Sequence, residues 1–359
     1  MGFDVWKRDP FARKDAMSVP CVSVMMSIHK EPIEWIRRSI DSILGQSFAD
    51  FEFIIVNDNP EWEENTLLLE DYVRRDSRII VITNETNLGL TKSLNKALVK
   101  ARGEFIARMD ADDISSLKRF EKQVAFLNNH PSIIAVGCWV IPIDEGGKQF
   151  EQIVTYEPNP RWARAQFLQN SQVCHPASMF RRVNDGVVVQ YDESMRYAQD
   201  YALWVSLLPY GDIANIPEPL LSLRSSRQQI TSSKKEEQRA CAERVQARAF
   251  SLFDFPSDDA FLKLFSALTI HHSTDLPVEE VTTLFKRFFA DVRLTKQNSL
   301  ALEVVYSTYL GFLLSKSGGS PNKLFKDTFK GNSPFMLRIG CRLGFHLLGR
   351  KLSRAFKSN

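Results

Sequence analysis

The sequence has no long apolar run and no patterned set of cysteines. No segment reaches the roughly 20 uncharged apolar residues that a membrane-spanning helix needs, and the charged N-terminus lacks the apolar stretch of a secretory signal. The cysteines are scattered, odd in number and without CxxC spacing: Cys21, Cys138, Cys174, Cys241 and Cys341. These absences argue against a disulfide framework and a zinc site, and they predict a reducing, cytoplasmic location.

A large excess of charge is also lacking. The 359 residues carry a formal net charge of +3, which is too small to indicate a nucleic-acid partner. With 44% hydrophobic and 25% charged residues, the composition is that of an ordinary globular chain. This length predicts one large domain and a smaller one, while the oligomeric state stays open.

Short apolar runs alternate with segments of helical periodicity. Strands are expected within 22–28, 51–60, 78–84 and 104–109, and helices within 31–46, 66–75, 90–102 and 116–131. Such alternation predicts an α/β fold with a mainly parallel sheet. Shorter mixed segments follow to residue 232, and long helical ones after it. The predicted organisation is a polar tail at 1–18, an α/β domain at 19–232, a helical region at 233–330 and a C-terminal segment at 331–359.

Polar clusters follow three of the predicted strands. "SIHKE" follows the first, "NDN" the second and "DADD" the fourth. Ligands of open α/β sheets lie beyond the carboxyl ends of the strands, so we expect one site shared by these clusters.

The acidic cluster suits a divalent cation. Asp110 and Asp112 are two residues apart after an extended segment, so their side chains can point the same way. Mg²⁺ or Mn²⁺ binds through one or two carboxylates together with phosphate oxygens. The alternative is that Asp112 or Asp113 caps the following helix.

Four segments in this order resemble glycosyltransferase family 2, whose members have the GT-A nucleotide-diphospho-sugar transferase fold. "VSVMMSIHKE" resembles the family's first strand and loop, and "FEFIIVNDN" resembles "IIVDDGS". "NLGLTKSLNKAL" resembles the segment that carries N-x-G, and "MDADD" resembles the D-x-D motif. The resemblance extends over roughly residues 20 to 232.

The resemblance implies roles for individual residues. Ser27 and Glu31 would lie at the base and ribose of the nucleotide, and Asp58 would hydrogen-bond the base. Asp110 would lie near the ribose or the metal, and Asp112 would coordinate the metal that bridges the diphosphate. Around the nucleotide the loop would be shaped by three further residues: Asn87, Gly89 and Asn95.

On the acceptor side, Asp200 in "YAQDYALW" resembles the acidic element that precedes a helix with an inward Trp. Asp200 would be the catalytic base, although residue patterns alone do not separate it from Asp192 or Glu193, and helix capping is its structural alternative. His175 and Arg224 would lie near the acceptor or diphosphate, or else have structural roles. The chain departs from the family pattern at four places: His29-Lys30, Asn57, Pro60 and Ser226.

The C-terminal segment is basic and amphipathic. Arg338, Arg342, His346, Arg350 and Arg354 recur every four residues beside apolar rows, and no acidic residue follows Asp327. This pattern is typical of a helix on an anionic membrane surface, here the inner face of the cell membrane. A terminal helix packed on the rest of the chain is the alternative.

Together these features predict an inverting, metal-dependent glycosyltransferase. Its donor would be a nucleotide-diphospho-sugar, and its acceptor a lipid-linked glycan of bacterial surface polysaccharide. Processive synthases carry a QxxRW motif that this sequence lacks. Two alternatives stay open. A nucleotidyltransferase would need a glycine-rich loop after the first strand, where "SIHKEPIEW" has no glycine, and a catalytically inactive nucleotide-sugar-binding scaffold would retain the fold without turnover.

Overall fold

The computed structural model describes residues 19–184, 186–225, 232–256, 258–270, 274–295 and 298–317. The predicted tail at 1–18, the basic segment at 331–359 and Ser226 lie outside these described residues. No described helix is both long enough and apolar enough to cross a membrane.

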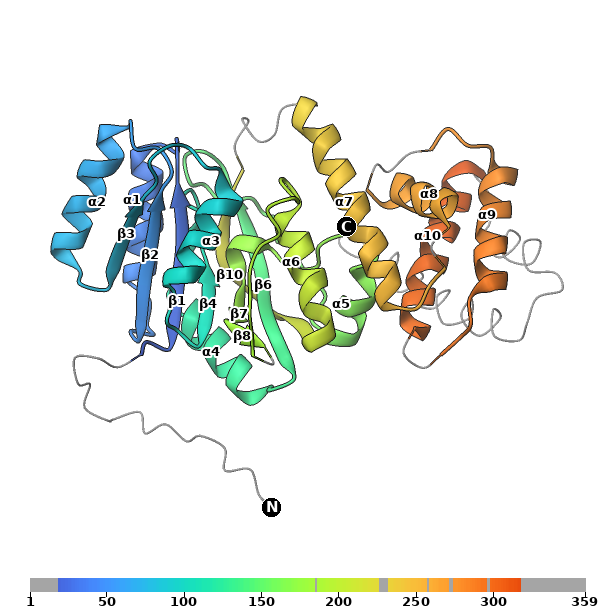
Figure 1. Ribbon diagram of the computed structural model, residues 1–359, viewed down its shortest axis with the longest axis horizontal. Coiled ribbons are helices and arrows are strands. Elements are labelled where there is room, and N and C mark those ends of the chain that lie inside the picture. Colours follow the sequence, from blue (N-terminus) through green and yellow to red (C-terminus); the bar gives the residue numbers. More distant parts are fainter. Residues whose placement is uncertain are drawn as a thin grey trace, which may run out of the picture.

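The first half of the chain forms most of a β-sheet that is flanked by helices (Figure 1). Strands β1 (Val22–Ile28), β2 (Phe51–Asn57), β3 (Ile79–Thr83) and β4 (Phe105–Arg108) are parallel. They are connected by α1 (Ile33–Leu44), α2 (Glu63–Arg75) and α3 (Leu90–Lys100). Every residue of β1 and β2 is buried, because helices cover both faces of the sheet. The alternation predicted from the sequence is confirmed.

Four further strands extend this sheet, and two of them, β7 and β5, run antiparallel to their neighbours. The complete order is β3-β2-β1-β4-β7-β6-β10-β5, with β7 (Met179–Arg181) antiparallel to both β4 and β6 (Ile133–Ile143). The strand β10 (Asp212–Arg224) pairs in parallel with β6, and the short β5 (Ile114–Ser115) pairs with its end. The remaining elements are α4 (Arg119–Asn129), α5 (Pro160–Gln166), the 3₁₀ turns His175–Ala177 and Leu208–Tyr210, the hairpin β8 (Val183–Asn184) and β9 (Val187–Val188), and α6 (Gln199–Leu207).

Four helices follow the sheet and pack beside α5 and α6 (Figure 1). They are α7 (Ser232–Leu252), α8 (Asp259–Thr269), α9 (Val278–Asp291) and α10 (Ser299–Ser317). Their phenylalanines belong to the same buried cluster as Trp204 and Leu168 of the sheet half. Polar contacts cross the junction as well, since Gln246 Nε2 donates to the Leu168 carbonyl over 2.7 Å. The helices therefore share a core with the sheet.

Candidate functional site

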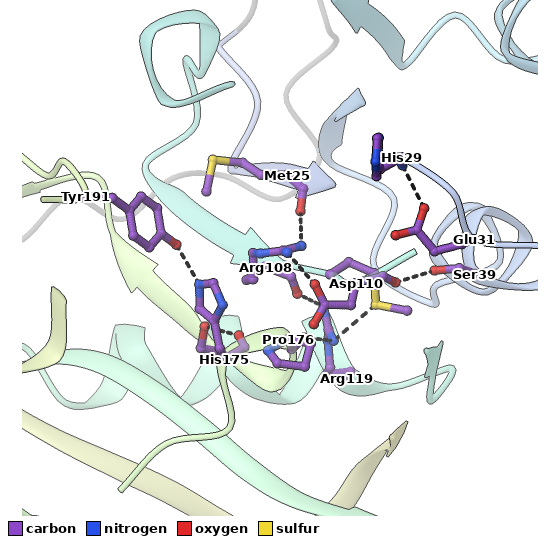
Figure 2. Close-up of polar contacts among 12 residues, drawn as sticks. Met25, His29, Glu31, Ser39, Arg108, Asp110, Arg119, His175, Pro176 and Tyr191 are labelled. Carbon is purple, nitrogen blue, oxygen red and sulfur yellow. Dashed lines mark hydrogen bonds and ion pairs between the residues drawn. The ribbon is translucent and has the colours of Figure 1, made fainter. Parts of the chain in front are cut away.

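The acidic cluster lies where β4 ends, beside the carboxyl end of β1. Asp110, Asp112 and Asp113 each place a carboxylate oxygen within 4.8 Å of the others. Asp113 is buried, whereas Asp110 and Asp112 keep part of their surface exposed. Main-chain contacts hold the loop, since Met109 N–H donates to the Met25 carbonyl and Ser39 Oγ donates to the Asp110 carbonyl (Figure 2). The loop thus presents three carboxylates at one point.

Neither Asp112 nor Asp113 caps the following helix. Helix α4 begins at Arg119 with Lys118 at its N-cap position, and β5 lies between the acidic cluster and this helix. The capping alternative is therefore wrong, because the chain first adds a strand to the edge of the sheet at β10.

Three buried arginines surround the acidic cluster: Arg108, Arg119 and Arg224. No pattern in the sequence marks the first two. Both are fully buried, and Arg224 is 1% exposed. Arg108 Nη2 pairs with Asp110 Oδ1, and Arg119 Nη2 donates to the Arg108 carbonyl over 3.0 Å (Figure 2). The backbone N–H of Arg224 donates to Asp113 Oδ1 over 2.8 Å. These guanidinium groups offset part of the repulsion among the carboxylates.

The electrostatic environment still disfavours further negative charge. Burial raises the pKa of Asp112 to about 7, and the neighbouring Asp110 and Glu31 carboxylates raise it further in the same direction. Burial, together with the Asp110 and Asp112 carboxylates, holds the pKa of the Asp113 carboxyl well above its usual range. The Asp110 carboxylate raises the pKa values of Asp112, Asp113 and Asp200, whereas Arg224 lowers those of Asp112 and Asp113. A bound divalent cation would favour the ionised form of these carboxyl groups.

The Asp58 carboxylate accepts hydrogen bonds from the loop that precedes α3. Its Oδ1 accepts from Leu88 N–H over 2.8 Å and its Oδ2 from Gly89 N–H over 2.9 Å. Asn84 Nδ2 adds a third hydrogen bond of 2.7 Å to Oδ1. Asp58 is 2% exposed, so this carboxylate supports the loop, and its contact with a base stays a prediction.

The other residues of the predicted nucleotide side lie around the ends of β1 and β3. Ser27 is buried within β1, and Glu31 Oε2 accepts from His29 N–H over 2.7 Å. Asn87 Nδ2 lies 3.0 Å from the imidazole nitrogens of His29. Asn95 instead joins α3 to the segment before α6, through Nδ2 to the Tyr191 carbonyl over 3.0 Å. Contact of any of them with a nucleotide is untested.

Asp200 lies in the first turn of α6, partly buried. The N-cap position of this helix is Ala198, so Asp200 does not cap it. Burial raises the pKa of Asp200, and the nearby Asp110 carboxylate raises it further. Trp204 of the same helix is fully buried, as predicted, and it packs edge-on against Phe180 at 5.8 Å. A carboxylate kept reachable on a fixed helix is suited to accept a proton.

His175 and Arg224 have structural partners. His175 Nε2 lies 2.8 Å from the Tyr191 hydroxyl, and burial holds the His175 pKa well below its usual range, so the ring is neutral (Figure 2). Arg224 Nε donates to the Asp112 carbonyl over 2.7 Å, and Nη1 donates to the carbonyls of Asp144 and Glu145 over 2.8 and 3.0 Å. Arg224 therefore braces the acidic loop, and acceptor contact by either residue stays a prediction.

Known proteins resemble this chain in sequence. Residues 23–187 match the model of glycosyl transferase family 2. The O-antigen biosynthesis glycosyltransferase WbnJ of Escherichia coli is 32% identical over 207 residues, which cover 56% of this chain and 79% of WbnJ. The chain belongs to glycosyl transferase family 2. An uncharacterised glycosyltransferase of Methanocaldococcus jannaschii is 38% identical to this family-2 chain, over 53% of the chain and 65% of the relative.

Solved structures agree on the fold. The crystal structure of Staphylococcus aureus TarS 1–349 in complex with UDP-GlcNAc matches with a TM-score of 0.52. The match covers 83% of this chain and 92% of that one, at 17% identity. The predicted GT-A fold of this family-2 chain is thereby confirmed, together with its C-terminal helices.

Proposed function

We propose that this family-2 glycosyltransferase moves a sugar from a nucleotide-diphospho-sugar to a glycan acceptor, with a divalent metal and with inversion at the anomeric carbon. The observation that carries the proposal is the group of Asp110, Asp112 and Asp113, whose oxygens lie within 4.8 Å of one another at the strand ends. Asp200, in the first turn of α6, lies near enough for the Asp110 carboxylate to raise its pKa. A direct displacement needs metal ligands for the departing diphosphate and a base for the acceptor hydroxyl.

The donor set fits Mn²⁺ or Mg²⁺. Both are hard cations that favour carboxylate oxygens, and both leave coordination positions for phosphate. Asp110 and Asp112 would hold the ion, while Asp113 Oδ1 is engaged with the Arg224 backbone. When bound, the ion would stabilise the negative charge that develops on the departing diphosphate.

Asp200 would supply the proton transfer. In a displacement with inversion, the acceptor hydroxyl attacks the anomeric carbon from the face opposite the diphosphate. Asp200 Oδ would take the hydroxyl proton as the new glycosidic bond forms. Its raised pKa favours this role, because a more basic carboxylate accepts a proton more readily.

The acceptor and the location are inferred from relatives and from the sequence. WbnJ is named for O-antigen biosynthesis, and the Erwinia amylovora relative AmsE, 29% identical, is named for amylovoran biosynthesis. An Escherichia coli relative is named as a galactosyltransferase acting on a sugar-diphosphoundecaprenol. A lipid-linked acceptor of surface polysaccharide fits these names. The basic segment at 331–359 would then hold the enzyme on the inner face of the cell membrane.

A screen of nucleotide-sugars tests the proposal. We expect one donor to release its nucleoside diphosphate when Mn²⁺ or Mg²⁺ and a membrane extract are supplied. Asp112→Ala and Asp200→Asn should each lower the rate at least 100-fold. Asp71→Ala, which changes an exposed carboxylate on α2, is the matched control and should retain the wild-type rate.

Other outcomes of this screen would favour one of the alternative functions or contradict the proposal. A donor that binds with metal but shows no turnover with any acceptor extract would favour the inactive scaffold. Release of pyrophosphate from a nucleoside triphosphate and a sugar phosphate would favour a nucleotidyltransferase. If no nucleotide-sugar binds at all, the proposal is wrong.

A further inference from the structure

Arg108 is the last residue of β4, and its backbone is fixed on both sides. Its N–H donates to the Ser178 carbonyl over 3.0 Å, and its own carbonyl accepts from Arg119 Nη2 over 3.0 Å. Its side chain has no exposed surface. The guanidinium therefore extends from a fixed backbone and lies beside Asp110 (Figure 2).

The guanidinium reaches Asp110 and little else. Arg108 Nη2 pairs with Asp110 Oδ1, while Nη1 makes a longer hydrogen bond of 3.3 Å to the Met25 carbonyl. Within the described part of the chain, Arg108 Nε is buried without a hydrogen-bond partner. The Asp110 side chain keeps 34% of its surface, and Ser39 holds its carbonyl. Arg108 thus fixes one carboxylate oxygen of Asp110, while the side chain stays exposed enough to contact a ligand.

A buried ion pair is a poor source of stability. Removing two charges from water costs about as much as their attraction returns, and apolar replacements of the same volume are often neutral or stabilising. Carboxylates that bind metals, by contrast, are regularly oriented by hydrogen bonds from neighbouring groups. Because the guanidinium of Arg108 is only partly hydrogen-bonded, a role in orienting Asp110 explains it better than a role in stability.

We propose that Arg108 is a positioning residue that fixes Asp110 in the orientation from which it binds the divalent cation. This inference rests on the proposed function, because it presupposes a cation at the acidic cluster. Two roles of Arg108 would act on cation affinity in opposite directions. A guanidinium that only adds positive charge weakens the binding of a cation, whereas one that orients a ligand strengthens it.

Mn²⁺ binding to the metal-free protein separates these roles, measured by calorimetry and by the electron paramagnetic resonance of free Mn²⁺. We expect Arg108→Met to weaken binding at least tenfold, although it removes a nearby positive charge. Arg108→Lys retains the charge without the planar fork and should recover only part of the affinity. Arg102→Met removes the partner of Glu52 away from the cluster, so it is the matched control and should bind as the wild type does.

A double-mutant cycle adds a second criterion. In the Asp110→Asn background, Arg108→Met should change the affinity less than twofold, because the ligand that Arg108 positions is already altered. If thermal unfolding shows that Arg108→Met is not folded, Arg108→Lys in the two backgrounds decides in its place.

Unchanged or tighter Mn²⁺ binding by the Arg108 variants overturns the inference, as do additive effects in the cycle. Asp112→Ala reports on the proposed function separately. If the wild type and Asp112→Ala bind Mn²⁺ equally, or neither binds it, then the metal site itself is wrong and the inference fails with it. If Asp112→Ala alone weakens binding, the metal site stands and only the role of Arg108 is rejected.

Discussion

Asp58 at the end of β2 accepts a hydrogen bond of 2.9 Å from the N–H of Gly89, the residue that precedes α3. Gly89 has a φ of +84°, a conformation that side chains rarely adopt, and this turn directs the N–H toward the carboxylate. The second carboxylate oxygen takes Leu88 N–H, so the negative charge of Asp58 lies at the positive end of α3. The order of the 84–89 loop therefore depends on a residue that directly follows another strand.

We expect Asp58→Asn to destabilise the protein by about 2 kcal/mol, because an amide supplies one acceptor oxygen where the loop needs two. Urea denaturation followed by circular dichroism would measure the loss. Asp71→Asn, on the exposed face of α2, should change the free energy of unfolding by less than about 0.5 kcal/mol. Equal effects of the two substitutions would contradict the role given to Asp58.

Arg224→Met should destabilise the protein by about 2–4 kcal/mol. The substitution leaves the carbonyls of Asp112, Asp144 and Glu145 without the guanidinium that they share, at a site where Arg224 itself is buried. Arg38→Met removes an exposed pair with Glu34 and should have an effect within about 0.5 kcal/mol. Chemical denaturation of both variants gives the comparison. A small loss in Arg224→Met would mean that the acidic loop is held mainly by its backbone contacts.

The stability of the metal-free protein should fall as the pH rises from 5.5 to 8. The pKa of Asp112 is raised to about 7 in the folded chain, so the folded state binds this proton more tightly than the unfolded state does. The stabilisation is complete below the unfolded pKa near 4 and is lost as the pH rises through about 7. Asp112 alone would contribute about 2 kcal/mol over this interval.

Asp112→Asn tests this dependence directly. The advantage of the variant over the wild type should be about 2 kcal/mol larger at pH 8 than at pH 5.5, when both are unfolded with urea in the presence of a chelator. The raised pKa of Asp113 acts in the same direction and remains in both proteins. Parallel pH profiles for the wild type and the variant would refute the assignment to Asp112.

The pH dependence of kcat/KM should report Asp200. Because burial raises its pKa, the acidic limb of the profile should lie above the pH at which an ordinary aspartate titrates, near 3.9. Asp200→Asn should lower kcat/KM by 10²- to 10⁴-fold and abolish the limb. Asp192→Asn provides the control in the segment before α6, where Asp192 pairs with Arg248 over 3.0 Å. A profile that changes with Asp192 and not with Asp200 would reassign the base.

Long, strongly patterned segments were predictable from the sequence. The run "VSVMMSI" forms β1 with the bounds expected, because a strand buried on both faces is apolar throughout. The strand β7 was not predicted, since its three residues carry no periodicity and it forms only through pairing with β4 and β6. Strand order of this kind depends on contacts between distant segments.

The candidate site was predictable in its acidic residues and not in its cationic ones. "DADD" follows an apolar strand and stands out, whereas Arg108 and Arg119 look like surface residues in a chain with many arginines. Buried Arg108 pairs with Asp110, and buried Arg119 donates to the carbonyls of Arg108 and Pro176. The spacing of residues in the sequence does not reveal these contacts. The same holds for Asp58, whose partners lie 30 and 31 residues away.

The core that α7–α10 share with the sheet limits how this chain can be divided. Gln169 of the sheet half donates to Thr308 Oγ1 of α10 over 3.0 Å, and Arg248 of α7 holds the segment that leads into α6. A chain cut at residue 232 would expose the apolar faces of α5 and α6 to water. The helices after the sheet are thus an integral part of the folded enzyme. Chimeras that exchange these helices between relatives would also have to exchange α5 and α6.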